Sequence, residues 1–205
     1  TIAGESESAD EGLSYKAAQR GIGELLKSAS STNLAWPEVL AACQFEAEQV
    51  AQLDSKDMDF ETWIRLAQRC DHWLAQDDVA ALVVTHGTDT LEETATFLHL
   101  SVDSDKPIVV VGAMRPATAY SADGPANLLD ACSVAACPTA RGRGTLVVMN
   151  GRIHSGLWVG KRHVSSVEAF DSPLAGAVGE VADQAVQWFR AAGRAPTVAW
   201  QTPST

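Results

Sequence analysis

Thr85-His86-Gly87-Thr88-Asp89-Thr90 is the stretch that decides the fold of this chain. It separates an apolar run, residues 79–84, from a helical pattern that begins near Leu91. A short apolar run followed by a helix is typical of a buried strand in a parallel sheet. Thr88 and Asp89 are therefore expected at the carboxyl end of a strand, where open α/β sheets bind their ligands. Glycine, threonine hydroxyls and a carboxylate in so short a run can bind a polar ligand and supply a nucleophile.

The composition indicates a single globular core, with room for an appendage. The 205 residues are 46% hydrophobic and 20% charged, and the formal net charge is −11. No apolar run approaches the roughly 18 residues that a membrane-spanning helix needs. Because no basic stripe is present, we expect neither nucleic acid nor a membrane as a partner. The four cysteines, Cys43, Cys70, Cys132 and Cys137, lack paired ligand spacing, so we expect buried free thiols, no metal and no cofactor.

Strand and helix patterns alternate along the chain, which predicts an α/β fold with a doubly wound, mostly parallel sheet. The expected strands cover residues 45–53, 79–84, 107–112 and 144–149. The expected helices cover residues 15–28, 63–74, 91–100 and 125–136. Either Asp57 or Asp59 is expected to cap the second of these helices.

The two ends of the chain differ from its middle. Residues 1–14 are small and acidic and predict a solvated loop. Residues 154–167 are polar and contain glycines, so we expect a loop over the carboxyl edge of the sheet. Residues 177–181 and 185–189 predict a short hairpin. We expect one domain over residues 1–190 and a linker or tail over residues 191–205.

The predicted strand ends bring several chemically active side chains to one edge. Ser55 follows the first expected strand, Thr88 and Asp89 the second, and Ala113 the third, whereas Lys161 follows the fourth. A threonine hydroxyl is a weak nucleophile until a base removes its proton. Lysine can be that base, and an aspartate beside it can orient its ammonium group. Threonine, aspartate and lysine thus form a coherent variant of the catalytic triad.

Each of these residues also has a purely structural interpretation. Thr88 and Asp89 could cap a helix, Ser55 could stabilise a turn, and Lys161 could be an ordinary surface lysine. His86 is interpreted as a hydrogen-bonding residue at a strand end. Other structural assignments are packing for Tyr15, Trp63 and Trp73, and first-turn acids favoured by the helix dipole for Glu92 and Glu93.

The motifs together resemble the bacterial-type L-asparaginase/glutaminase family. Residues 85–94 are similar to its second signature, and Thr1-Ile2-Ala3-Gly4 matches its Thr-Gly-Gly-Thr-Ile-Ala-Gly motif from the second threonine onward. Further similar stretches follow in order at residues 54–58, 112–116, 121–125 and 147–150, and then at Lys161. The resemblance implies a Rossmann-like asparaginase N-terminal domain whose first strand and C-terminal domain lie outside this sequence.

The resemblance implies hydrolysis of L-asparagine to L-aspartate and ammonia, with some glutaminase activity. Thr1 corresponds to the threonine that attacks the side-chain amide and forms an acyl-enzyme, and Tyr15, in a mobile lid, would activate it. Thr88 would hold the attacking water or act as the second hydroxyl. Lys161 would be the base, with Asp89 beside it.

The resemblance also implies how the substrate is held. Ser55 would bind its α-carboxylate and Asp89 its α-ammonium group, while backbone N–H groups near Thr88 and Ala113 would stabilise the oxyanion. Lys56 stands where many secreted members have glutamine, a difference that bears on the preference between asparagine and glutamine. A homotetramer of close dimers is implied as well. Ser104 stands where some exported members have a cysteine, which favours the cytoplasm over the periplasm.

Three other classes of protein remain as alternatives. Thr1 at a free terminus would suit an N-terminal nucleophile hydrolase, which needs neither residues 85–90 nor Lys161. The ammonia-producing subunit of a tRNA-dependent amidotransferase also resembles asparaginases. An amino-acid-binding module would bind aspartate without releasing ammonia from asparagine.

Overall fold

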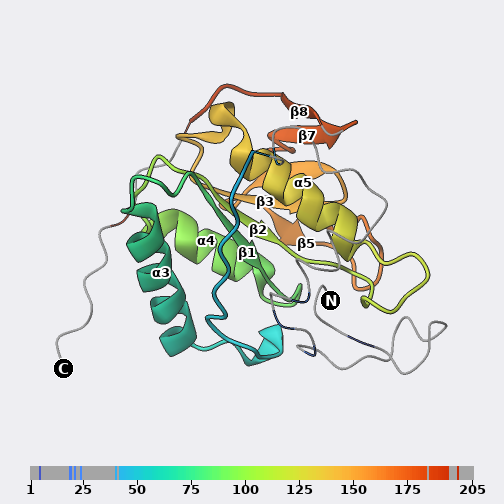
Figure 1. Cartoon of the computed structure of the whole chain (residues 1–205). Helices are drawn as coiled ribbons and strands as arrows, with labels where there is room; N and C mark the ends of the chain where they lie inside the picture. Colours follow the sequence, from blue (N-terminus) through green and yellow to red (C-terminus); the bar gives the residue numbers. More distant parts are fainter. Residues whose placement is uncertain are drawn as a thin grey trace.

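The protein folds into three layers, with a mixed β-sheet between helices (Figure 1). This computed structural model describes residues 42–183 and 185–193, together with residues 5, 19, 21, 24, 40 and 198. The α/β class expected from the sequence is confirmed. The expected helix at residues 15–28 and the loop at residues 1–14 lie almost entirely outside the described residues, as do Thr1 and Tyr15.

Between residues 60 and 149 the elements follow the predicted alternation. The helical segments are η1 (Ser55–Asp57), α3 (Phe60–Leu74), α4 (Leu91–Ser101), α5 (Gly124–Ala136) and η2 (Pro138–Ala140). The larger sheet contains β1 (Leu82–Thr85), β2 (Ile108–Val111), β3 (Thr145–Met149), β4 (Arg152–Ser155), β7 (Gly179–Ala182) and β8 (Ala185–Trp188). A separate two-stranded ribbon is made by β5 (Gly160–Lys161) and β6 (Phe170–Asp171).

The larger sheet has the strand order β1-β2-β3-β4-β7-β8. β1, β2 and β3 are parallel, and each further pairing in the sheet is antiparallel. In the parallel part the register pairs Thr85 with Val111 and Val111 with Val148. The carboxyl ends of these three strands therefore lie side by side, and the segments that follow them start from one edge.

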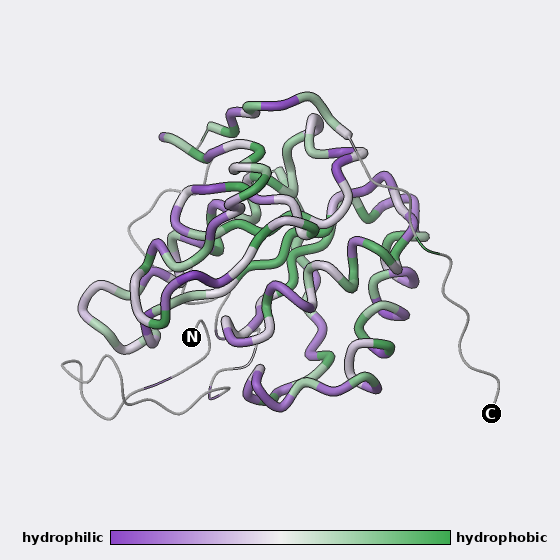
Figure 2. Tube along the Cα trace, turned by 180° about the vertical axis from the view of Figure 1, so that it is seen from behind, coloured by the Kyte–Doolittle hydropathy of each residue, from purple (hydrophilic) through white to green (hydrophobic). Residues whose placement is uncertain are grey.

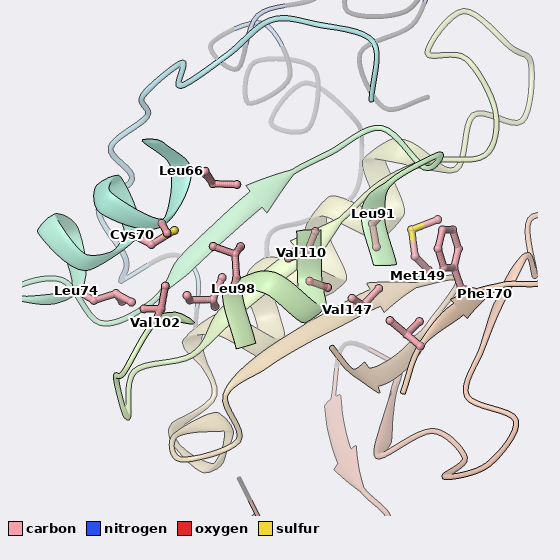
Figure 3. Packing of buried hydrophobic residues seen from close by; sticks show 14 of the residues in the cluster. Leu66, Cys70, Leu74, Leu91, Leu98, Val102, Val110, Val147, Met149 and Phe170 are labelled. Atoms are coloured by element: carbon pink, nitrogen blue, oxygen red, sulfur yellow. The ribbon is translucent and has the colours of Figure 1, made fainter. Parts of the chain in front are cut away.

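Hydrophobic clusters cover both faces of the parallel strands. Val109, Val111 and Val148 pack toward α5, whereas Val110 and Val147 pack toward α3 and α4. Figure 3 shows this second cluster, in which Phe170 of the ribbon also takes part. Because successive side chains point to opposite faces, a strand covered on both faces must be apolar throughout. Figure 2 accordingly shows the centre of the molecule as its most hydrophobic part.

Helix α3 begins where the sequence predicted a capped start. Asp59 is the N-cap, and its Oδ1 accepts a hydrogen bond of 2.8 Å from the Thr62 N–H. The apolar stripe that includes Leu66, Cys70 and Leu74 is buried against α4 and the sheet. Of the two aspartates proposed as caps, Asp59 is therefore the correct one.

Two predictions of local structure are wrong. Residues 45–53 form no strand, because they are paired into neither of the described sheets and residues 45–49 are largely exposed. Residues 154–167 are not a loop throughout, since they include the end of β4 and all of β5. Short strands of two to four residues with mixed polarity give too little periodic signal to separate them from a loop.

Other predictions have mixed outcomes. The hairpin is confirmed as β7 and β8, which pair Glu180 with Gln187. The expectation that the thiols are buried holds for Cys70 and Cys132 only, because Cys43 is exposed and Cys137 half-buried. Burial raises the pKa of each buried thiol, Cys70 and Cys132, to about 12.

Among the described helices, none is both long and apolar enough for a bilayer crossing.

Candidate active site

The centre of the site is a contact between Lys161 and the segment that follows β1. The Lys161 ammonium donates hydrogen bonds to Thr88 Oγ1 at 2.9 Å and to Asp89 Oδ1 at 2.8 Å. Thr88 is 4% exposed, whereas the side chains of Lys161 and Asp89 are 20% and 47% exposed. A hydroxyl, an ammonium and a carboxylate thus meet where the protein interior opens to solvent.

Ser55 joins this group from the other side. Its Oγ accepts a hydrogen bond of 3.2 Å from the Asp89 N–H, and its carbonyl oxygen accepts one of 2.7 Å from Thr90 Oγ1. A Cβ placed on Gly87 would lie 2.5 Å from Ser55 Oγ. Position 87 therefore admits only glycine without displacing Ser55. The sequence prediction that Ser55, Thr88, Asp89 and Lys161 converge is confirmed as geometry.

A chain of hydrogen bonds that begins at Trp63 on α3 supports the segment after β1. Trp63 Nε1 lies 2.8 Å from Thr94 Oγ1, which lies 3.0 Å from His86 Nε2, and His86 Nδ1 lies 2.7 Å from the Gly87 carbonyl oxygen. The indole can only donate and the carbonyl can only accept. In a neutral imidazole, Nδ1 must then carry the proton and Nε2 must accept one from Thr94. Burial lowers the pKa of His86, which favours this neutral form.

The Gly87 carbonyl belongs to the same peptide plane as the Thr88 N–H. Because a trans peptide is rigid and planar, fixing the carbonyl also fixes the direction of the N–H. His86 therefore orients one of the backbone donors expected near Thr88. The interpretation of His86 as a hydrogen-bonding residue at a strand end is confirmed.

Ala113 lies at the end of β2, fully buried. A Cβ on the preceding Gly112 would come within 3.0 Å of the His86 carbonyl oxygen and 3.2 Å of Thr88 Cγ2. Gly112 thus allows the segment after β2 to pack directly against the one after β1. The segment that contains Ala113 therefore lies against Thr88 through Gly112.

Asp123 and Asn127, which received no role from the sequence, shape the segment after β2. The Asp123 carboxylate accepts hydrogen bonds of 2.9 Å from the N–H groups of Met114 and Arg115. Asn127 Nδ2 donates to the Gly112 carbonyl at 3.0 Å, and Asn127 Oδ1 accepts from the Asn150 N–H at 3.0 Å. Asn127 therefore joins the carboxyl ends of β2 and β3.

The geometry disagrees with two of the purely structural interpretations, the helix cap at residues 88 and 89 and the surface lysine at position 161. Thr90, not Thr88 or Asp89, is the N-cap of α4, and it makes no side-chain capping bond. Lys161 is not an ordinary surface lysine, because its ammonium has two short hydrogen bonds. Trp73, assigned to packing, donates to Glu48 Oε2 at 2.6 Å and lies beside Arg69.

Lys56, next to Ser55, has its own acidic partner. It is exposed and forms an ion pair of 3.1 Å with Asp54. The hydrogen bond to that aspartate raises the pKa of Lys56. No cluster of three metal-ligating side chains occurs in the part of the chain that the structure describes.

The sequence matches the family model for the N-terminal part of asparaginases over residues 1–194. The chain belongs to the asparaginase family. An L-asparaginase 2 from Bacillus subtilis (strain 168) is 46% identical over 183 residues, which cover 89% of this chain and 47% of that protein. A glutaminase-asparaginase from Pseudomonas fluorescens biotype A is 44% identical over 190 residues, covering 93% of this chain and 50% of that protein.

The fold agrees with that of a solved asparaginase. A crystal structure described as a probable cytoplasmic L-asparaginase from Campylobacter jejuni superposes with a TM-score of 0.88 at 40% sequence identity. The superposition covers 96% of this chain and 58% of the other. This asparaginase chain spans about half the length of the curated relatives it matches.

Proposed function

We propose that the intact protein hydrolyses L-asparagine to L-aspartate and ammonia. The observation that carries the proposal is the position of the Lys161 ammonium, 2.9 Å from Thr88 Oγ1 and 2.8 Å from Asp89 Oδ1. A base within hydrogen-bond distance of a hydroxyl, and itself held by a carboxylate, has the geometry of an activated nucleophile. Relatives named L-asparaginase and glutaminase-asparaginase support the choice of substrate.

The proposed reaction has two halves. The Thr1 hydroxyl attacks the side-chain amide carbon, the C–N bond breaks, and ammonia leaves as an ester forms on Thr1. Water then attacks the ester, releasing aspartate and restoring the hydroxyl. Thr88 and Lys161 activate the oxygen nucleophile, and Tyr15 assists Thr1. These roles of Thr1 and Tyr15 rest on the resemblance alone.

Substrate binding is proposed to use Ser55 and Asp89, which are joined by a hydrogen bond. Ser55 binds the α-carboxylate, and Asp89 binds the α-ammonium group. Because the Asp89 side chain is 47% exposed, it has room for a second cation beside Lys161. Backbone N–H groups near Thr88 and Ala113 stabilise the oxyanion. Holding both ends of a small substrate places its amide next to the nucleophile, which accelerates the reaction by proximity.

Three further properties are part of the proposal. Some glutaminase activity is expected, since a relative is named for both activities. We propose a homotetramer of close dimers and the cytoplasm as the compartment. Support for the compartment comes from Ser104 and from the similarity to the Campylobacter jejuni protein, which is described as cytoplasmic. The periplasm is the alternative.

The test is ammonia release from L-asparagine by the intact protein, compared with its Lys161→Met variant. The variant should lose at least about 10³-fold in kcat, because it removes the base and keeps a similar side-chain volume. Arg141→Met is the matched control, since Arg141 is an exposed cation that precedes β3 at the opposite sheet edge. It should keep wild-type activity.

Each alternative predicts a different result in the same experiment. Full activity of Lys161→Met would favour an N-terminal nucleophile hydrolase. Aspartate binding measured by calorimetry, without ammonia release, would favour a binding module. Ammonia release from glutamine that depends on a charged tRNA would favour an amidotransferase subunit.

A further inference from the structure

The residue that needs explanation is Lys161, because it lies on a strand of only two residues. β5 belongs to the ribbon, and its hydrogen-bond partner is β6 rather than the larger sheet. Thr88 and Asp89 follow β1 of the larger sheet. A lysine side chain has a flexible four-carbon stem, so its two hydrogen bonds alone do not determine where its backbone lies. Something must hold this strand relative to residues 88 and 89.

One side of β5 is held by the ribbon itself. Lys161 pairs with Phe170, which is 5% exposed and packs in the cluster between the sheet and helices α3 and α4 (Figure 3). The next residue, Arg162, donates its N–H to the Ala169 carbonyl oxygen at 2.6 Å. Backbone groups in an antiparallel pair alternate between facing the partner strand and facing away. The Lys161 N–H therefore points away from β6, toward the open edge of the ribbon.

Glu92 supplies the acceptor on that open edge. Its Oε2 accepts the hydrogen bond from the Lys161 N–H. The same oxygen lies 3.8 Å from where a Cβ on Gly160 would be, so the carboxylate lies alongside β5. Glu92 is in the first turn of α4, three residues after Asp89. A single segment, residues 88–92, thus holds Lys161 at its backbone and at its ammonium.

We propose that Glu92 is a positioning residue for the Lys161 base, acting through the backbone of β5. This inference rests on the proposed function. With the N–H held by Glu92 and the ammonium held by Thr88 and Asp89, the flexible stem is fixed at both ends. Glu93, the neighbouring acid of the same helical turn, is exposed and makes no such contact among the described residues.

The kinetic test compares Glu92→Ala, Glu92→Asp and Glu92→Gln, with Glu93→Ala as the matched control. Glu92→Ala should lower kcat for asparagine about tenfold or more with less than about threefold change in KM, because the base is displaced while the substrate contacts remain. Glu92→Asp should show a similar loss, because its side chain is one methylene too short to reach. Glu92→Gln should recover most of the activity, since its carbonyl oxygen can accept the same N–H.

A role limited to the helix dipole would give a different pattern. In that case Glu92→Ala and Glu93→Ala would behave alike, and Glu92→Gln would not rescue, which would overturn the inference. The comparison uses four variants, so failure of one to fold leaves the others to decide.

A second measurement does not depend on activity. Amide hydrogen exchange at Lys161 should be slow in the wild-type protein and in Glu92→Gln, and faster in Glu92→Ala. If the wild-type protein releases no ammonia but this exchange pattern is observed, the proposed function fails while the backbone contact stands. Unchanged exchange at Lys161 in Glu92→Ala, in an active enzyme, refutes the inference and leaves the proposed function intact.

Discussion

The parallel and antiparallel parts of the sheet differ in how their sequences specify them. Every residue of β2 and β3 is buried, whereas β7 is half-buried after its first residue and β8 alternates between exposed and half-buried positions. The parallel part is covered on both faces, so its strands are continuous apolar runs. The segment that contains Thr88 follows β1 of this part. Lys161 comes from the weakly specified ribbon and reaches its position only through tertiary contacts.

The candidate site therefore depends on two kinds of interaction, one in the parallel part and one between the two parts. β1, β2 and β3 hold the segments with Thr88 and Ala113 as neighbours through their register, and hydrogen bonds from Asp123 and Asn127 support the second segment. The lysine depends on hydrogen bonds to residues 88, 89 and 92. We therefore expect stability to depend mainly on the parallel part and catalysis to depend on the contact between the parts.

The largest expected change in stability tests this division directly. Leu98→Ala removes a fully buried side chain that packs between α4 and the parallel strands, and it should lower the free energy of unfolding by about 2–5 kcal/mol. Val186→Ala, on β8, removes a partly buried side chain and should cost no more than about 1.5 kcal/mol. Denaturant unfolding followed by circular dichroism measures both. Equal losses would contradict the comparison.

A smaller effect is expected from two glycines that sit in close contacts. A Cβ on Gly87 would meet Ser55 Oγ, and a Cβ on Gly179 of β7 would meet the Gln187 carbonyl oxygen, each at 2.5 Å. Gly87→Ala and Gly179→Ala should each lower the free energy of unfolding by about 1–3 kcal/mol. Only Gly87→Ala should also weaken aspartate binding, because it displaces Ser55. Calorimetric titration distinguishes them, and equal weakening of binding in both would show that the two parts are coupled.

The smallest effect concerns α5, which packs against β1, β2, β3 and β8 and so covers both parts. Burial raises the pKa of Asp130 on this helix to about 6 from 3.8. Between these values the folded state binds more protons than the unfolded state, so stability falls as the pH rises. Asp130→Asn should remove this decline and gain on the order of 1 kcal/mol at pH 7 relative to pH 4. Unfolding free energies measured across this pH range check it, and identical slopes in both proteins would contradict it.

The sequence predicted the parallel part well because each of its signals is local. An apolar run, a glycine-containing connection and a helix follow one another twice, at residues 79–101 and 107–136, and parallel strand ends always meet at one edge. The proximity of the segments that contain Thr88 and Ala113 follows from that rule. Ser55 was predicted from a strand at residues 45–53 that does not form, and it reaches Asp89 and Thr90 through hydrogen bonds instead. Lys161 was placed by resemblance instead, since its own surroundings in the sequence contain no periodic signal.

The missed features depend on pairings between distant residues. Residues 45–53 have the alternation of a strand but no partner strand in the described sheets, and alternation alone does not supply one. Asn127 is in the first turn of an apolar helix, and its bonds to Gly112 and Asn150 could not be derived from spacing. Glu92 was interpreted as a first-turn acid because its partner is 69 residues away. For Asn127 the sequence did contain a clue: an amide among the apolar residues of a helix is expected to be buried, and a buried amide needs hydrogen-bond partners.

The direction of the hydrogen bonds between Trp63 and Gly87 has a consequence for enzymology. Thr94 has one hydroxyl proton, and it is committed to His86. In an imidazolium, His86 Nε2 would carry a proton of its own, which would face the Thr94 hydroxyl proton and break this hydrogen bond. His86 is thus an imidazole beside the proposed active site that stays neutral near pH 7. Any inflection in a rate profile at the usual histidine pH has to be assigned to another group.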